Sequence, residues 1–75
     1  MDRLSVEEEI LNRYVTYRYS PEYTPLRTNV ERVGRNRPTI YRLTTVSGAQ
    51  YVGTIPRIRR QMDLRILVQI LLEMS

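Results

Sequence analysis

Arginine and tyrosine side chains supply most of the chemistry that this sequence offers. All twelve basic residues are arginines, and the six tyrosines are the only aromatic residues. A guanidinium group presents a planar fork of donors that suits phosphates, and an exposed aromatic ring can stack on an unpaired base. Arginines beside exposed tyrosines are therefore typical of a surface that binds single-stranded nucleic acid.

The arginines form two groups along the chain. We expect the group nearer the C-terminus to face phosphates, with two tyrosines as stacking candidates, and the predicted nucleic-acid-binding residues are Arg57, Arg59, Arg60, Arg65, Tyr41 and Tyr51. A second basic patch is predicted at Arg32, Arg35, Arg37 and Arg42. Two simpler interpretations stay open, in which most tyrosines fill a small core and the arginines form a solvated face balanced by eight acidic residues.

The residue types that common catalytic and metal sites require are absent. The sequence contains no histidine, lysine or cysteine, which excludes the usual nucleophile–base pairs, Schiff-base chemistry, disulfides and ordinary zinc sites. The acidic run Glu7–Glu9 suits the start of a helix better than a metal cage. Nothing in the spacing of the other carboxylates favours general acid–base catalysis. We therefore predict no enzyme activity, no metal and no cofactor.

The length and charge of the chain limit its class. Its 75 residues predict a single domain over residues 1–75, near the lower size limit for a self-sufficient core. Without disulfides or metals, self-association or a permanent protein partner is the remaining way to stabilise such a core. The net charge of +4 also favours contact with polyanions. Residues 1–10 do not resemble an export signal and no apolar run is long enough to span a bilayer, which predicts a cytoplasmic protein without a membrane partner.

The elements that would position these side chains begin with a short helix, predicted over about residues 6–12. Ser5 and Glu8 stand in the S-x-x-E capping-box arrangement, and apolar residues then recur at helical spacing. After the helix, valine and tyrosine alternate with polar residues, which predicts a strand over 14–19.

A hairpin is the clearest pattern in the middle of the chain. Two stretches rich in branched and aromatic residues predict strands over 39–46 and 50–58, and the turn between them lies at Ser47 and Gly48.

The C-terminal segment admits two interpretations. Read at period two, its apolar residues fall on one side, which indicates a strand over about residues 62–73. The alternative is a buried helix, because Pro56 is suited to a first helical turn and many good helix formers follow. We favour the strand, and its apolar side predicts an oligomer interface of Leu64, Ile66, Val68, Ile70 and Leu72.

The segment YRLTTVSGAQYVGTIPRIRRQMDL (residues 41–64) resembles the first motif of the Sm/LSm/Hfq family. Gly48 matches the glycine at the motif's turn, and Gly53 matches the glycine of the next strand. The apolar core positions of the motif are matched by Ile55, Ile58, Met62 and Leu64. The N-terminal stretch SVEEEILN looks like the helix that precedes the barrel in Hfq. The resemblance implies a strongly bent barrel, a ring of subunits and RNA binding.

These expectations combine into one prediction of fold and function. The predicted fold is mainly β, a small, strongly bent SH3-like or Sm-like barrel with a short N-terminal helix, which self-assembles through strand edges and binds single-stranded RNA. The alternative is a protein-binding adaptor, inhibitor or assembly linker that docks through its apolar C-terminal segment. The barrel, and with it the RNA surface, depends on strand character in residues 62–73.

Overall fold

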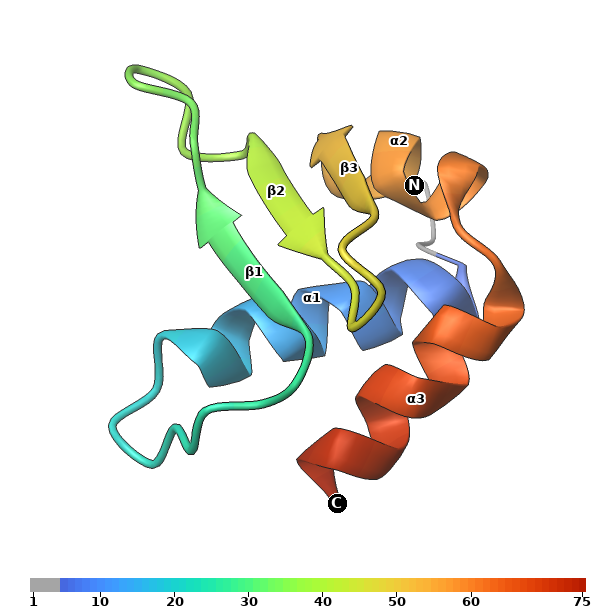
Figure 1. Cartoon of the computed structure of the whole chain (residues 1–75). Coiled ribbons are helices and arrows are strands. Elements are labelled where there is room, and N and C mark those ends of the chain that lie inside the picture. The colour runs from blue at the N-terminus through green and yellow to red at the C-terminus, as the bar shows by residue number, and fades with distance from the viewer. Residues whose placement is uncertain (1–4) are drawn as a thin grey trace.

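Three helices and a three-stranded sheet make up residues 5–75, the part of the chain that the computed structural model describes (Figure 1). Along the chain the elements are α1 (Val6–Arg18), β1 (Asn29–Arg32), β2 (Tyr41–Thr44), β3 (Gln50–Gly53), α2 (Ile55–Gln61) and α3 (Leu64–Met74). Residues 1–4, where the acidic N-terminal stretch begins, lie outside the described residues.

Helix α1 begins at the capping box that the sequence predicts. The Glu8 amide donates to the Ser5 hydroxyl at 3.1 Å, and the Ser5 amide donates to the Glu8 carboxylate at 3.2 Å. Two of the amides that a helix N-terminus leaves without partners are satisfied in this way.

The same helix continues to Arg18, so the strand predicted over 14–19 is wrong. Leu11, Tyr14 and Val15 are all buried, and their i, i+3, i+4 spacing places them on one face of the helix. Burial of that face stabilises the helix, and it outweighs the local alternation that favoured a strand.

The strands form one antiparallel sheet in the order β1-β2-β3, and α1 crosses one of its faces (Figure 1). Val30 pairs with Leu43, and Leu43 pairs with Tyr51, so these three side chains point to the face that packs on α1. Glu31 pairs with Arg42 on the opposite face. The sheet is therefore apolar toward the helices and polar toward its outer side, as is common for antiparallel sheets.

The hairpin predicted at Ser47 and Gly48 is present, with shorter strands than the sequence indicates. The Gly48 amide donates to the Thr45 carbonyl at 3.0 Å, and Gly48 has a φ of 90°. Each strand is four residues long, and both predicted strands, 39–46 and 50–58, extend beyond the paired residues.

Helix α2 begins where the second predicted strand was expected to continue. Pro56 lies in the first turn of α2, where its fixed φ favours a helix and its missing N–H costs nothing. Gly53 has a φ of 146°, and a Cβ there would lie 2.8 Å from the Arg57 Cδ atom. Glycine is therefore what allows the chain to fold α2 directly back against β3.

The C-terminal segment is a helix, so the strand predicted over 62–73 is wrong. Asp63 caps α3 by accepting a hydrogen bond from the Arg65 amide at 2.9 Å. Leu67 and Ile70 are buried at an i, i+3 spacing that brings both to one face of a helix.

The fold class predicted from the sequence is consequently wrong. Among residues 5–75, helices of 13, 7 and 11 residues outweigh three strands of four residues, and the sheet is open. The chain is neither mainly β nor a closed barrel. One core joins the helices to the sheet, and its buried apolar residues are Leu11, Tyr14, Val15, Val30, Leu43, Ile55, Ile58, Leu67 and Ile70.

Candidate functional site

The arginines predicted to bind nucleic acid differ in their exposure and in their acidic partners. Arg57 and Arg60 are exposed on α2. Arg59 is half-buried, and its guanidinium lies 3.9 Å from the Glu7 carboxylate. Arg65 forms an ion pair of 2.8 Å with the adjacent cap residue Asp63. Within residues 5–75, two of the four guanidinium groups, those of Arg57 and Arg60, thus form no ion pair.

The two tyrosines predicted to stack on bases are part of the protein's own packing. Tyr41 and Tyr51 are half-buried and pack against the core from the inner face of the sheet. Both rings therefore take part in the protein's own packing and keep part of their surface exposed.

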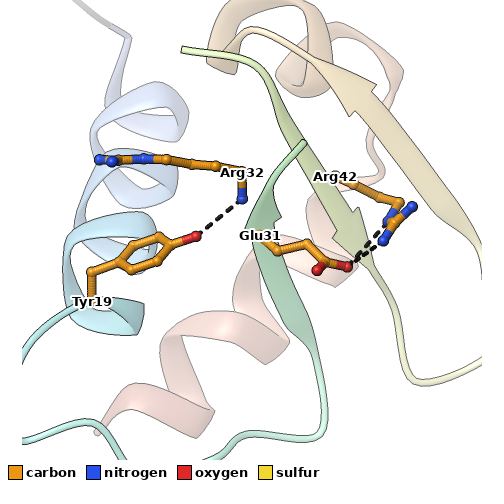
Figure 2. Close-up of polar contacts among 4 residues, drawn as sticks. All are labelled: Tyr19, Glu31, Arg32 and Arg42. Carbon is orange, nitrogen blue, oxygen red and sulfur yellow. Dashed lines mark hydrogen bonds and ion pairs between the residues drawn. The ribbon is translucent and has the colours of Figure 1, made fainter. Parts of the chain in front are cut away.

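The sheet separates the members of the second basic patch. Figure 2 shows Arg32 on one side of β1 beside Tyr19, while Arg42 lies on the other side beside Glu31. Arg42 donates to the Glu31 carboxylate from Nε, at 3.2 Å, and from Nη2. Arg42 is therefore held by an acid, and the patch reduces to the arginines in and next to the β1–β2 loop.

That loop, residues 33–40, presents two exposed arginines, Arg35 and Arg37. Three backbone hydrogen bonds brace it, from Val33 to Ile40, from Arg37 to Gly34 and from Ile40 to Arg37, at 3.1, 3.4 and 3.2 Å. Figure 1 shows the loop projecting from the sheet at the side of the molecule opposite α3. We call Arg32 together with residues 33–40 the basic loop.

A cluster of alternating guanidinium groups and rings, which sequence reasoning missed, adjoins the basic loop. The Arg32 guanidinium lies 4.9 Å from the centre of the Tyr19 ring, and the Arg18 guanidinium lies 5.5 Å from that ring and 4.6 Å from the Tyr23 ring. The Tyr19 hydroxyl also accepts a hydrogen bond from the Arg32 amide at 3.0 Å (Figure 2). Cation–π contacts of this kind tie the end of α1 to β1.

The edge of β1 is protected from further strand pairing. The Tyr19 hydroxyl takes the outward-facing amide of Arg32, and the Glu73 carboxylate takes the amides of Arg27 and Thr28 at 2.6 and 3.1 Å. Side chains that occupy an edge in this way block the addition of another strand. Pairing of another strand along this part of the edge is therefore disfavoured.

Helix α3 carries an apolar stripe on the side that faces solvent. Leu64, Val68 and Leu72 are 61%, 54% and 70% exposed, and their i, i+4, i+8 spacing aligns them along the helix. They are three of the eight large apolar residues that are exposed within residues 5–75, and they include both leucines of that set. We call these three residues the α3 stripe.

The structure divides the predicted oligomer interface between two faces of α3. Three of its residues form the α3 stripe, whereas Ile70 is fully buried in the core and Ile66 is half-buried against it. A strand would have placed all five on one side, but a helix rotates by about 100° per residue.

The basic residue of α3, Arg65, lies beside the α3 stripe and is paired with an acid. Arg65 adjoins Leu64, and it hydrogen-bonds Asp63 through Nε and Nη2 at 3.1 and 2.8 Å. These hydrogen bonds hold the pKa of the Asp63 carboxyl below its usual value. The carboxylate therefore stays ionised, and the pair remains neutral as a unit.

A buried chain of hydroxyl groups fastens the opposite side of α3 to the sheet. The Tyr14 hydroxyl donates to Thr28 Oγ1 at 3.1 Å, and Thr28 Oγ1 donates to the Glu73 carboxylate at 3.4 Å. Burial raises the pKa of Tyr14 to about 12 despite the hydrogen bond to Thr28, which acts in the opposite direction. These contacts fix the orientation of α3, so that the α3 stripe points away from the core.

Two concave sites on this surface are open and poor in carboxylates. Two open hollows have volumes of about 450 and 410 Å³, and the first is lined by one carboxylate, Glu22, while the second is lined by none. Within residues 5–75, no three acidic side chains gather in a way that could hold a metal ion. In the same part of the chain, no helix combines the length and apolarity needed to cross a membrane.

Comparisons of the chain with models of known families, with curated proteins and with solved structures find no match. The resemblance to the Sm/LSm/Hfq family therefore stays a prediction about relationship, although the barrel that it implies is wrong for this chain. The arguments for function rest on the α3 stripe and the basic loop.

Proposed function

We propose that this protein is a non-catalytic protein-binding module that docks through the α3 stripe, and that the occupant of the stripe is a second copy of the same chain. The exposure of Leu64, Val68 and Leu72 on one helix face carries the proposal. Contiguous apolar surface on a small protein marks a site of protein association.

The order of side chains in the α3 stripe is self-complementary. Leu64, Val68 and Leu72 read the same in both directions along the helix, with valine at the centre. An antiparallel two-fold contact at Val68 places Leu64 of one copy on Leu72 of the other, twice. Such an isologous contact is the commonest way in which proteins form homodimers.

Charge supports a second copy as the occupant. The chain carries a net charge of +4, so most contacts between two copies bring arginines together. At the α3 stripe the flanking Arg65 is already neutralised by Asp63 at 2.8 Å. Two copies can therefore meet there without the repulsion that other faces of the molecule would produce.

The small core gives a reason for the association. Nine buried apolar side chains form the core of a 75-residue chain, and domains of this size have a small margin of stability. Covering two exposed leucines and a valine in each copy adds apolar burial, which contributes about 25 cal/mol per Å² removed from water.

The test is a measurement of molecular mass with a matched pair of variants. Sedimentation equilibrium of the unmodified protein should give twice the chain mass of 9.0 kDa. Val68→Asp should give the single-chain mass with an unchanged circular dichroism spectrum, because its carboxylate would meet its own copy at the two-fold axis. Val52→Asp, at a half-exposed position on the outer face of β3, is the control and should remain dimeric.

A single-chain mass for the unmodified protein at every concentration would contradict the proposal. Loss of the dimer in the Val52→Asp control as well would show that added negative charge, and not the α3 stripe, decides association.

A further inference from the structure

We infer that the basic loop, Arg32 together with residues 33–40, binds the phosphate backbone of double-stranded nucleic acid without reading base sequence. This activity goes beyond the proposed dimerisation and rests on different residues. It is also distinct from the predicted RNA surface, whose tyrosines are packed into the core.

The local excess of positive charge is the first observation. The segment from Arg32 to Arg42 contains four arginines and no acidic residue. Glu31 pairs with Arg42 through the outer face of the sheet, and no ion pair engages Arg32, Arg35 or Arg37 within the described chain. Three guanidinium groups are thus available to phosphates.

The loop is also held in one shape before any ligand arrives. Its three internal backbone hydrogen bonds define consecutive tight turns. Gly34 is packed so closely that a Cβ would lie 2.5 Å from the Arg37 carbonyl oxygen and 2.9 Å from the Ile40 Cβ. A braced loop loses little conformational entropy on binding, so its arginines are preorganised for a charged partner.

The chemistry of the loop favours nucleic acid over a lipid surface. Its tip, Arg35-Asn36-Arg37, is entirely polar, and it offers no apolar or aromatic side chain to insert among acyl chains. Arginine instead matches phosphate oxygens with paired donors from a planar fork.

The surrounding rings favour a duplex over a single strand. Tyr19 and Tyr41 adjoin the loop. The Tyr19 ring is in contact with the guanidinium groups of Arg18 and Arg32, and Tyr41, the cross-strand partner of Arg32, packs against the core. Single-strand binding relies on free aromatic faces for successive bases. Because both rings already make contacts within the protein, phosphates are the main target of the loop, and contact with phosphates carries no sequence information.

The positions of the two surfaces make them compatible. The basic loop lies at the side of the molecule opposite α3 (Figure 1), so a dimer formed through the α3 stripe leaves both loops accessible. Two linked sites strengthen binding through effective concentration, but each loop is sufficient for contact with phosphates.

The test is the salt dependence of binding to a labelled mixed-sequence DNA duplex, followed by fluorescence anisotropy. Neutralising a phosphate contributes about −0.9 to the slope of log K against log salt concentration, so three arginines predict a slope of about −3 for one loop. The assay uses the Val68→Asp variant, which is expected to be a single chain, so that each molecule carries one basic loop. The double variant Arg35→Gln, Arg37→Gln should bring the slope to about −1 and weaken binding at low salt.

The matched control removes the same charge elsewhere. Arg57→Gln with Arg60→Gln changes two exposed arginines on α2 and should leave the slope unchanged. If both double variants lost affinity and slope equally, the effect would be one of net charge, and the inference would be overturned. A loss of affinity in the α2 variant alone would overturn it as well.

Further arms of the assay distinguish the ligand. A second duplex of different sequence should bind with the same affinity, and single strands should bind more weakly than the duplex. Tighter binding to single strands, binding to anionic vesicles but not to duplex, or no binding at low salt would each overturn the inference. A dimeric mass for the unmodified protein together with failure of the duplex assay would reject the loop site and leave the α3 stripe unaffected.

Discussion

Glu73 has a structural role that its place near the chain end does not suggest. Its carboxylate bridges 45 residues of sequence to accept hydrogen bonds from the amides of Arg27 and Thr28, and it ends the chain of hydroxyl groups that begins at Tyr14. This one carboxylate thereby provides the acceptor for two backbone amides just before β1, and the same hydrogen bonds orient the last turn of α3. Thr28, at one end of this bridge, is buried, and a buried polar group must be hydrogen-bonded because a lost partner leaves it desolvated.

Replacing Glu73 should therefore destabilise the fold. Glu73→Ala removes the acceptor of two backbone amides, and we expect it to lower the free energy of unfolding by about 1–3 kcal/mol. Glu73→Gln keeps one carbonyl acceptor and should cost less. Urea denaturation of the two variants measures both changes, and an Ala variant as stable as the original chain would contradict the bridging role.

Tyr14 predicts a loss of stability at alkaline pH. Its pKa is raised from the ordinary value of 10.0 to about 12 in the folded state. Between these values the unfolded chain releases the phenolic proton and the folded chain retains it, so rising pH favours unfolding. The effect is absent below pH 10 and amounts to about 2–3 kcal/mol once pH reaches 12, at about 1.4 kcal/mol per pKa unit.

The variant Tyr14→Phe isolates this effect from the other five tyrosines. The difference in the free energy of unfolding between the original chain and the variant should be constant below pH 10 and shift toward the variant above it. A difference that does not change with pH would show that Tyr14 ionises equally in both states.

At the scale of elements, the two faces of α3 have separate roles. Leu67 is 3% exposed and packs in the core, whereas Leu64 is 61% exposed in the α3 stripe. The same residue type thus supports the fold at one position and the proposed dimer at the other. Leu64 and Leu67 differ by only about 60° of helical rotation, so their position along the helix separates them: Leu64 is the first residue of α3, and Leu67 lies nearly one turn further on.

A pair of identical substitutions tests that division. In the Val68→Asp background, where association is removed, Leu67→Ala should lower the free energy of unfolding by about 2–5 kcal/mol because it leaves a cavity. Leu64→Ala should change it by no more than about 0.5 kcal/mol, as expected of an exposed position. Thermal or urea denaturation gives both values, and equal losses would mean that the stripe is buried within one chain.

At the scale of the whole molecule, stability and association should be coupled. A dimer that forms from folded chains shifts the unfolding equilibrium by mass action, so the Tm of the original chain should rise with protein concentration. The Val68→Asp variant should show a Tm that does not depend on concentration. Differential scanning calorimetry over a concentration series makes the comparison, and a constant Tm for the original chain would oppose a dimer.

Much of the local structure could be predicted from the sequence. The capping box at Ser5 and Glu8, the turn at Gly48 and the absence of histidine, lysine and cysteine are all properties of neighbouring residues or of composition. Such features depend on side chains within a few positions of each other.

The errors arose where two periods fit the same residues. Val15, Tyr17 and Tyr19 alternate as a strand would, yet Val15 completes the buried i, i+3, i+4 face of α1 with Leu11 and Tyr14. Residues 62–73 alternate as well, but the Asp63 cap and the burial of Leu67 and Ile70 support a helix. A short apolar segment satisfies both patterns, and packing against the rest of the chain chooses between them.

The sequence by itself determined the available chemistry: arginine as the sole cation, tyrosine as the sole ring, and no catalytic base other than carboxylates. Only the tertiary structure decided which of those groups face outward. It packed Tyr41 and Tyr51 against the core, paired Arg42 with Glu31, and left the α3 stripe and the basic loop exposed. The physical reason is that burial and ion pairing are contacts between residues distant in sequence, and these depend on the whole fold.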